Sequence, residues 1–102
     1  MAERAIVWTE TAAKQRREIL KYWTIRNGSD NYAKKLIKVS KEKTAVIASF
    51  PESGIETEIP SIRMSAMGHF SIFYKVTETK LIIVAFWDNR QDPRKLLGSS
   101  GL

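Results

Sequence analysis

An unbroken apolar run, Leu81–Trp87, constrains the fold of this chain more than any other segment. A run of this length between polar residues is typical of a β-strand that is buried on both faces. The chain then turns polar at once, in a segment that we call the polar cluster: Asp88, Asn89, Arg90, Gln91 and Asp92. Polar side chains held at the end of a rigid strand often form a site. A solvated turn closed by Asp92-Pro93 explains the same pattern, and both interpretations stay open at this point.

Two helices are predicted after a short strand at residues 4–8. Thr9 or Thr11 supplies an N-cap hydroxyl for the first helix, which extends to about Arg26. Gly28 is free to take the positive φ with which helices often end. Apolar and small side chains then recur at helical spacing from Asn31 to Ser49, which predicts the second helix. The short connection between the two makes them an antiparallel helical hairpin.

The second half of the chain has the alternating pattern of β-strands. Residues 62–66 and 70–76 alternate apolar and polar side chains, and a turn at 77–80 leads into the apolar run at 81–87. Helices and strands are therefore mostly segregated, in the order β-α-α-β-β-β. The sequence predicts a single α+β domain over residues 1–102, in which the helical hairpin packs on a mostly antiparallel four-stranded sheet.

Charge is distributed unevenly along the chain. Residues 1–50 carry eleven Lys/Arg against five Asp/Glu, whereas the remaining residues carry six of each. A basic surface attracts an acidic partner such as nucleic acid, the ribosome or an acidic protein, although solubility alone also explains a net charge of +6. The cations expected to meet such a partner lie on the two helices, at Lys14, Arg17, Lys21, Lys34, Lys35 and Lys38.

Composition excludes several classes of protein. The chain has no cysteine and one histidine, so it has no disulfide framework, no Cys-based metal site and no multi-His metal site of its own. We expect neither a metal nor another cofactor. No apolar run reaches the ~20 residues of a membrane span, and the first residues are too polar for a signal peptide. A cytoplasmic protein without a membrane segment is therefore expected.

The order of the elements and several local strings resemble the RelE/ParE superfamily of bacterial toxins from type II toxin–antitoxin modules. The resemblance extends from Val7 to Leu96. It rests on the Ile19–Trp23 string, the Ile47–Pro51 exit from the second helix with Gly54 after it, Arg63, the Phe70–Val76 strand and the closing Trp87–Pro93. The order and spacing of these strings, more than any one of them, identify the family.

This resemblance implies a small basic toxin that inhibits growth until a cognate acidic antitoxin neutralises it. The tail of the antitoxin is expected to wrap the toxin, and a higher-order toxin–antitoxin assembly is a further expectation. Members of the superfamily differ in their target. Some cleave mRNA on the ribosome, and others poison DNA gyrase without being nucleases.

The residues favour the second group. The nuclease members resemble one another in an arginine just after the aromatic of the third strand, an arginine near the end of the last strand, and a C-terminal tyrosine. Arg90 fits the second position, but Ser71 stands at the first and no tyrosine follows Tyr74. Metal-free RNA cleavage needs a base, positive charge and an acid. We therefore expect a toxin directed at DNA gyrase or at another target, rather than an enzyme.

Two alternatives stay open. A ribosome-dependent mRNA endonuclease would have to use Arg90, Arg63 and His69, with His69 as acid or base and Arg63 on the same sheet face as Ser71. The two arginines would then lie on one concave side of the sheet, within reach of one anion. A surface ion pair explains Arg63 equally well, and a solvated turn explains His69. The second alternative is a degenerate homologue that only binds its antitoxin.

Overall fold

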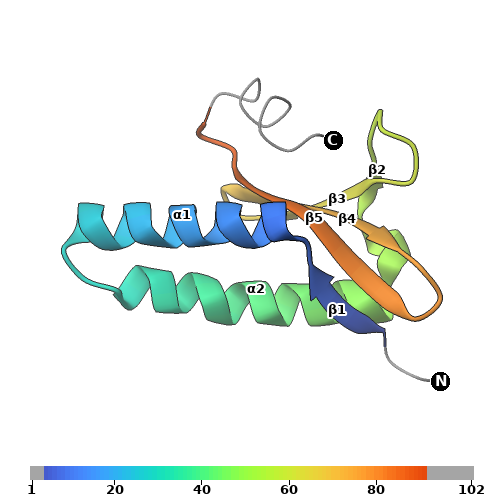
Figure 1. Ribbon diagram of the computed structural model, residues 1–102, viewed down its shortest axis with the longest axis horizontal. Helices are drawn as coiled ribbons and strands as arrows, with labels where there is room; N and C mark the ends of the chain where they lie inside the picture. The colour runs from blue at the N-terminus through green and yellow to red at the C-terminus, as the bar shows by residue number, and fades with distance from the viewer. Residues whose placement is uncertain (1–3, 92–102) are drawn as a thin grey trace.

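The computed structural model describes residues 4–91. Its elements are β1 (Ala5–Trp8), α1 (Glu10–Asn27), α2 (Asn31–Ser49), a short 3-10 turn (Pro51–Ser53), β2 (Ile55–Glu56), β3 (Arg63–Met67), β4 (Phe70–Val76) and β5 (Lys80–Asp88). The two helices form an antiparallel hairpin, and α1 packs against β5 (Figure 1). The α+β fold and the helical hairpin predicted from the sequence are confirmed.

The sheet has five strands in the order β1-β5-β4-β3-β2. This is one strand more than the four predicted from the sequence. The additional strand, β2, contributes only the pairs Ile55–Met64 and Glu56–Arg63 to β3. A two-residue strand is too short to produce an alternating pattern, which is why the sequence did not predict it. The pairing of β1 with β5 is parallel and the other three pairings are antiparallel.

The ends of α1 follow the sequence signals. Thr9 is the N-cap, and its Oγ1 accepts a hydrogen bond from the backbone N–H of Ala12 at 3.1 Å. Gly28 follows the helix in the left-handed conformation, with φ of 66°, and its N–H donates to the carbonyl of Ile25. A residue with a Cβ would be strained in that conformation. The hairpin can therefore reverse direction within a few residues.

The core lies between the hairpin and one face of the sheet. Ala12, Ile47, Ile72, Leu81 and Ile83 are fully buried there. The expectation that the run 81–87 is buried on both faces is correct only for its second half, because Ile82 and Val84 are half-buried. An irregularity in the pairing of β4 with β5 leaves Val84 without a partner. Beyond it, burial is continuous from Ala85 to Asp88.

Tyr74 fixes the chain that follows α2. Its hydroxyl donates to the carbonyl of Pro51 at 2.7 Å and accepts from the N–H of Gly54 at 3.0 Å. Burial raises the pKa of the Tyr74 phenol, which keeps it a hydrogen-bond donor at neutral pH. Arg63 extends the same network, because its Nη1 donates to the carbonyl of Gly54 at 2.8 Å.

Neither helix of the region described, residues 4–91, combines the length and the apolar character that a membrane crossing requires.

Candidate functional site

The polar cluster begins with an ion pair at the end of β5. Asp88 is the last residue of that strand and pairs across the sheet with Phe70, so that its side chain faces the helices. Arg90 folds back onto it. Its Nε and Nη2 donate to the two carboxylate oxygens of Asp88 at 2.9 and 3.0 Å, and its backbone N–H donates to Oδ1 at 3.0 Å. Such a bidentate pair fixes the orientation of both side chains in addition to the attraction between their charges.

The guanidinium of Arg90 also lies against aromatic rings. Its Cζ is 4.4 Å from the centroid of the Trp23 ring and 5.6 Å from that of Phe70. Trp23 belongs to α1 and Phe70 to β4, so Arg90 links the end of β5 to two other elements. The side chain of Asp88 is 8% exposed and that of Arg90 is 41% exposed. The pair is therefore buried on the carboxylate side and open to solvent on the guanidinium side.

The pair favours its charged state. Burial opposes ionisation of Asp88 and is the largest single influence on its pKa, but the hydrogen bonds from Arg90 together outweigh burial and lower that pKa below its ordinary value of 3.8. The hydrogen bonds to Asp88 raise the pKa of Arg90 in turn. Both groups are charged at neutral pH, and the Nε and Nη2 of Arg90 are engaged by Asp88.

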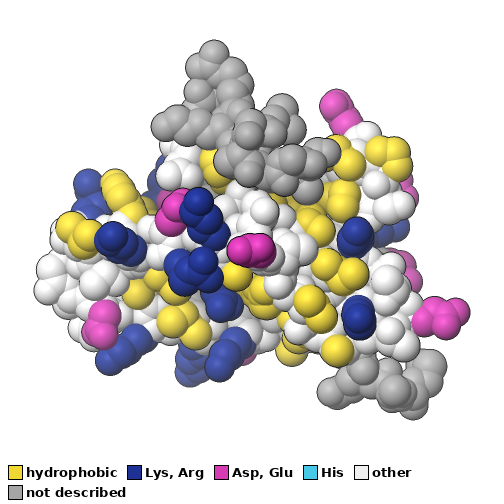
Figure 2. Space-filling view, in the orientation of Figure 1, with side chains coloured by type: hydrophobic (Ala, Val, Ile, Leu, Met, Phe, Trp, Pro, Cys, Tyr) yellow, Lys and Arg dark blue, Asp and Glu magenta, His cyan; other side chains and the backbone are white. Residues whose placement is uncertain are grey.

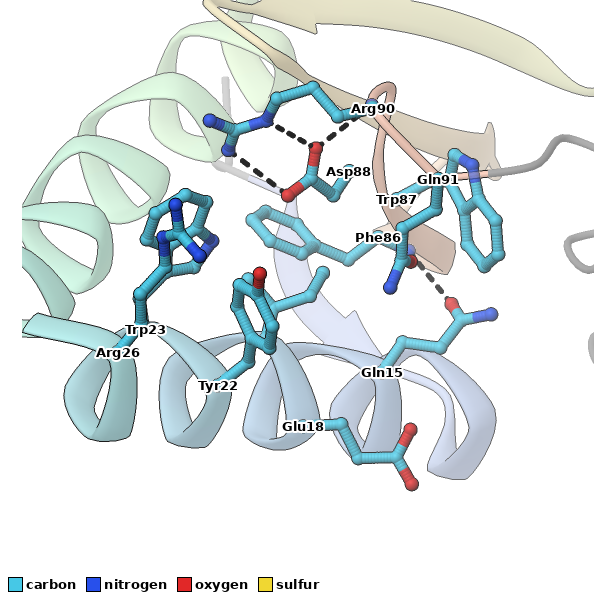
Figure 3. Close-up of a pocket in the computed structure, with 11 residues that line it drawn as sticks. Gln15, Glu18, Tyr22, Trp23, Arg26, Phe86, Trp87, Asp88, Arg90 and Gln91 are labelled. Carbon is cyan, nitrogen blue, oxygen red and sulfur yellow. Dashed lines mark hydrogen bonds and ion pairs between the residues drawn. The ribbon is translucent and has the colours of Figure 1, made fainter.

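A cleft of about 410 Å³ lies beside this pair, between α1 and the end of β5 (Figure 3). Its α1 side is lined by Gln15, Glu18, Ile19, Tyr22, Trp23 and Arg26, and its other side by Phe86, Trp87, Asp88, Arg90 and Gln91. The α1 residues recur at a spacing of three and four, so they form one stripe along the helix. Gln15 closes one end of this stripe, where its Oε1 accepts from the N–H of Phe86 at 2.9 Å.

Three residues that line this cleft each carry a buried side-chain N–H without an acceptor. Within residues 4–91, the buried side-chain polar atoms that lack a hydrogen-bond partner are Gln15 Nε2, Trp23 Nε1 and Trp87 Nε1. All three residues line the cleft. Trp23 makes a small contribution to lowering the pKa of Asp88, after burial and Arg90, but its geometry falls short of a hydrogen bond. Buried polar groups are rarely left unpaired. The three atoms do not share one surrounding, because the Trp87 side chain packs with Ala85 and Phe73 on the sheet face away from α1.

The other members of the polar cluster stabilise the turn after β5. Asn89 donates its N–H to the carbonyl of His69 at 2.7 Å, and its Oδ1 accepts from the hydroxyl of Ser71 at 2.8 Å. Gln91 donates its N–H to the carbonyl of Asp88 at 2.9 Å. Asp92 lies outside the described residues. The cluster is thus an internally bonded turn that also forms one wall of the cleft.

Arg63 and Arg90 are engaged at different places on the same side of the sheet, since the residues beside them on β4, Tyr74 and Phe70, both face the core. A shared anion site stays a prediction. Arg63 pairs across the sheet with Tyr74, whereas Arg90 follows a strand end that pairs with Phe70. Four residues along β4 correspond to about 13 Å. Arg63 is also engaged elsewhere, with Gly54 and with Glu56 at 3.4 Å.

Arg63 and Ser71 do not share a sheet face either. Ala66 lies opposite Ser71, and Arg63 is three positions before it on β3. An odd number of residues along a strand reverses the face, so Arg63 and Ser71 lie on opposite sides. His69 lies in the exposed turn between β3 and β4, beside Gly68. Arg63 therefore lies away from Ser71, whereas the turns that carry His69 and Arg90 adjoin through the hydrogen bond from the N–H of Asn89 to the carbonyl of His69.

The helical cations predicted to meet a partner are all exposed: Lys14, Arg17, Lys21, Lys34, Lys35 and Lys38. Figure 2 shows Lys and Arg side chains gathered over the two helices. Within the described part of the chain, the one ion pair that involves these six is Lys34 with Asp30, at 3.5 Å. No three His, Asp or Glu side chains in that part are close enough together to hold a metal ion.

Sequence reasoning did not identify Gln15. It lies three residues after Ala12 and four before Ile19, within the buried stripe of α1. A carboxamide within a buried helical stripe is the feature by which the sequence could have identified Gln15, because a buried polar side chain needs hydrogen-bond partners. Its Oε1 has one in Phe86, and its Nε2 does not.

Comparison with known proteins agrees with the fold. The sequence model of the family described as "ParE toxin of type II toxin-antitoxin system, parDE" matches residues 6–93. A solved structure, the chromosomal ParDE toxin–antitoxin system from P. aeruginosa, is similar with a TM-score of 0.69 and 19% identity, over 82% of this chain and 94% of that one. No curated protein matches in sequence. The family match spans most of the chain, and the protein belongs to the ParE toxin family of type II toxin–antitoxin systems.

Proposed function

We propose that this ParE-family toxin inhibits growth by acting on DNA gyrase or on another, undefined target, and that an acidic antitoxin neutralises it. The observation that carries this proposal is that the guanidinium groups of both candidate nuclease arginines are engaged within the protein, at different places. Arg90 is held by Asp88 and Trp23, and Arg63 is held by Gly54. Metal-free RNA cleavage needs its acid, base and cation around one phosphate.

The position of Ser71 supports the same conclusion. Nuclease relatives are expected to have an arginine there, whose charge would stabilise the transition state. The Ser71 hydroxyl is uncharged and already donates to Asn89 at 2.8 Å. Losing one such stabilising contact typically costs ~10²–10³ in rate. The arrangement of these residues supports a toxin that acts by binding, and the basic helices support an acidic partner.

The first test compares two targets with one purified protein. We expect inhibition of DNA supercoiling by gyrase, and no cleavage of mRNA on programmed ribosomes at rates approaching those of RelE-type nucleases. Mapping of transcript ends after induced expression extends the comparison to cells. Codon-phased cuts that disappear in Arg90→Ala or His69→Ala would contradict the proposal. Loss of both activities, with antitoxin binding retained, would identify a degenerate homologue instead.

The second test concerns the antitoxin. The ParDE name of the similar structure indicates a two-protein system, and the exposed cations of the hairpin suit an acidic chain. Reversal of Lys34, Lys35 and Lys38 to Glu is expected to slow association about tenfold or more at low salt and to reduce its salt dependence. Stopped-flow association measures the rate.

Reversal of Lys75 and Lys80, which are exposed on β4 and β5, serves as the control for net charge when it is compared with reversal of Lys34 and Lys35 alone, because both variants then reverse two charges. An association rate at low salt that is the same in the helical variant as in the wild type would refute the assignment of the hairpin as the antitoxin platform.

A further inference from the structure

Asparagine occurs at three positions of this chain, Asn27, Asn31 and Asn89, and only Asn27 precedes a glycine. An Asn-Gly pair converts without an enzyme when the backbone nitrogen of the glycine attacks the side-chain carbonyl carbon of the asparagine. The glycine has no side chain to obstruct that attack. The reaction also requires an accessible side chain, space for a ring and a backbone that can rotate, and all three depend on the fold.

Asn27 meets the first two of these conditions. It is the last residue of α1 and is exposed, at the end of the helical hairpin that lies away from the sheet (Figure 1). Gly28 stands in open surroundings, because a Cβ built on it would meet no atom beyond its chain neighbours within 4 Å. The exposure of Asn27 and the free space around Gly28 together leave room for a five-membered ring.

The backbone between these two residues is held weakly. While Asn27 keeps a helical backbone, the nitrogen of Gly28 does not face its side-chain carbon, so the ψ angle of Asn27 must change before the attack. The N–H of Gly28 donates to the carbonyl of Ile25 at 3.3 Å, which is longer than every other backbone hydrogen bond of the turns, loops and caps within residues 4–91. Helix ends open locally at little cost. The third condition is therefore met as well.

The other two asparagines are protected. Asn31 and Asn89 each precede a residue whose side chain obstructs the backbone nitrogen. At Asn89 the fold adds two restraints: its Oδ1 accepts from the hydroxyl of Ser71 at 2.8 Å, and the nitrogen that would have to attack, that of Arg90, donates its proton to Oδ1 of Asp88 at 3.0 Å. The sequence and the fold thus single out one asparagine.

We propose that Asn27 deamidates spontaneously and is the main site of chemical ageing in this protein. The nitrogen of Gly28 loses its proton and bonds to Cγ of Asn27. The bond from Cγ to Nδ2 breaks, and Nδ2 leaves with that proton as ammonia. Water then adds to one of the two ring carbonyl carbons, and the bond of that carbon to the Gly28 nitrogen breaks. Opening at Cγ gives aspartate, and opening at the backbone carbonyl gives isoaspartate.

Both products change the end of the hairpin. Each places a carboxylate at the C-terminus of α1, where the helix dipole disfavours negative charge. Isoaspartate also lengthens the backbone by one carbon, directly before the turn at Gly28 that joins α1 to α2, and these helices pack against each other. The aged protein is therefore expected to be less stable than the fresh one and to lose part of the positive charge of the hairpin.

The test incubates the purified full chain at physiological temperature and follows both products with time. Tandem mass spectrometry assigns deamidation to a residue, and labelling by an isoaspartyl methyltransferase detects isoaspartate. We expect both signals to accumulate at Asn27 and to rise faster at higher pH, because the attacking nitrogen must lose its proton. Deamidation at Asn27 that is no faster than at Asn31 would overturn the proposal.

Two matched variants and an unfolded reference sharpen the result. Asn27→Gln is expected to remove the isoaspartate signal, because a glutamine would have to close a larger ring, whereas Asn31→Gln makes the same change four residues later and is expected to leave the signal intact. The rate in the native chain is expected to lie within about tenfold of the rate in urea, since the end of α1 opens easily. A native rate far below this range would show that the helix protects Asn27, and would overturn the proposal.

The consequence for stability has its own measurement. The thermal unfolding midpoint of the wild type is expected to fall during the incubation, and that of Asn27→Gln is expected to stay constant. Circular dichroism of the fresh samples verifies that both begin with the same fold. An equal fall in the two proteins would overturn the assignment of the loss to Asn27.

Discussion

Gly54→Ala is expected to lower the free energy of unfolding by about 3 kcal/mol, because it combines overpacking with the loss of buried hydrogen bonds. The backbone at Gly54, with φ of −81°, is accessible to any residue, so the cost comes from space alone. A Cβ there would overlap the Tyr74 hydroxyl and lie 2.9 Å from the carbonyl oxygen of Met64. That carbonyl belongs to β3 and the tyrosine is buried, so neither can move away cheaply.

Equilibrium urea unfolding measures this loss, and Gly68→Ala provides the contrast. Gly68 has φ of 61° but open space around its Cα, so its substitution costs only the backbone term of roughly 1 kcal/mol. Tyr74→Phe removes the atom that an alanine at position 54 would meet, and the double variant is therefore expected to be more stable than additivity predicts. A loss in Gly54→Ala no larger than that in Gly68→Ala would show that the site can relax.

Arg90→Ala is expected to cost about 2–3 kcal/mol at pH 7, since it leaves the nearly buried carboxylate of Asp88 without its partner. The loss should depend on pH. In the wild type the pKa of Asp88 lies below 3.8, so the stabilisation is complete above that value and disappears as the pH falls through the lowered pKa. Without the Arg90 side chain, burial of Asp88 is opposed only by the backbone N–H of residue 90 and by Trp23, so the pKa of Asp88 rises above its wild-type value. The difference in stability between wild type and variant therefore grows as the pH rises toward neutrality.

The measurement is the difference in unfolding free energy between wild type and variant at a series of pH values from 3 to 7. That difference is expected to be small at the acidic end and full at neutrality. Arg17→Ala removes an exposed arginine of α1 that has no ion pair within the described residues, and it should show a small difference throughout. A loss in Arg90→Ala that does not vary with pH would mean that Arg90 acts through Trp23 rather than through Asp88.

Local signals in the sequence were enough to predict the hairpin and most of the sheet. Thr9 and Gly28 cap α1 as their chemistry requires, and the two stripes of small and apolar residues bury the faces that their spacing indicated. The strand β2 was missed because two residues form no pattern. The pairing of Val84 was not predictable either, since an irregularity between two strands is decided by their partners and not by local spacing.

The candidate site was predicted less well, for a physical reason. The polar cluster does form a wall of the cleft, but the other wall is α1, more than sixty residues earlier in the chain. Successive residues of a strand lie on alternate faces of the sheet. A shift of one residue along β3 therefore decides whether Arg63 lies on the face of Ser71 or on the opposite one, and it lies on the opposite one. Gln15 was overlooked because its role depends on the N–H of Phe86, and that contact exists only in the folded protein.

The order of the strands in the sheet affects how the chain folds during its synthesis. The central strand β5 lies between β1 and β4, although among the described elements it is synthesised last. Until it leaves the ribosome, β1 has no neighbour in the sheet and α1 lacks the strand that it mainly packs against. Domains fold as their segments emerge, so the described part of the fold stays incomplete until β5 has emerged. The wall of the cleft that β5 supplies is therefore the last to form.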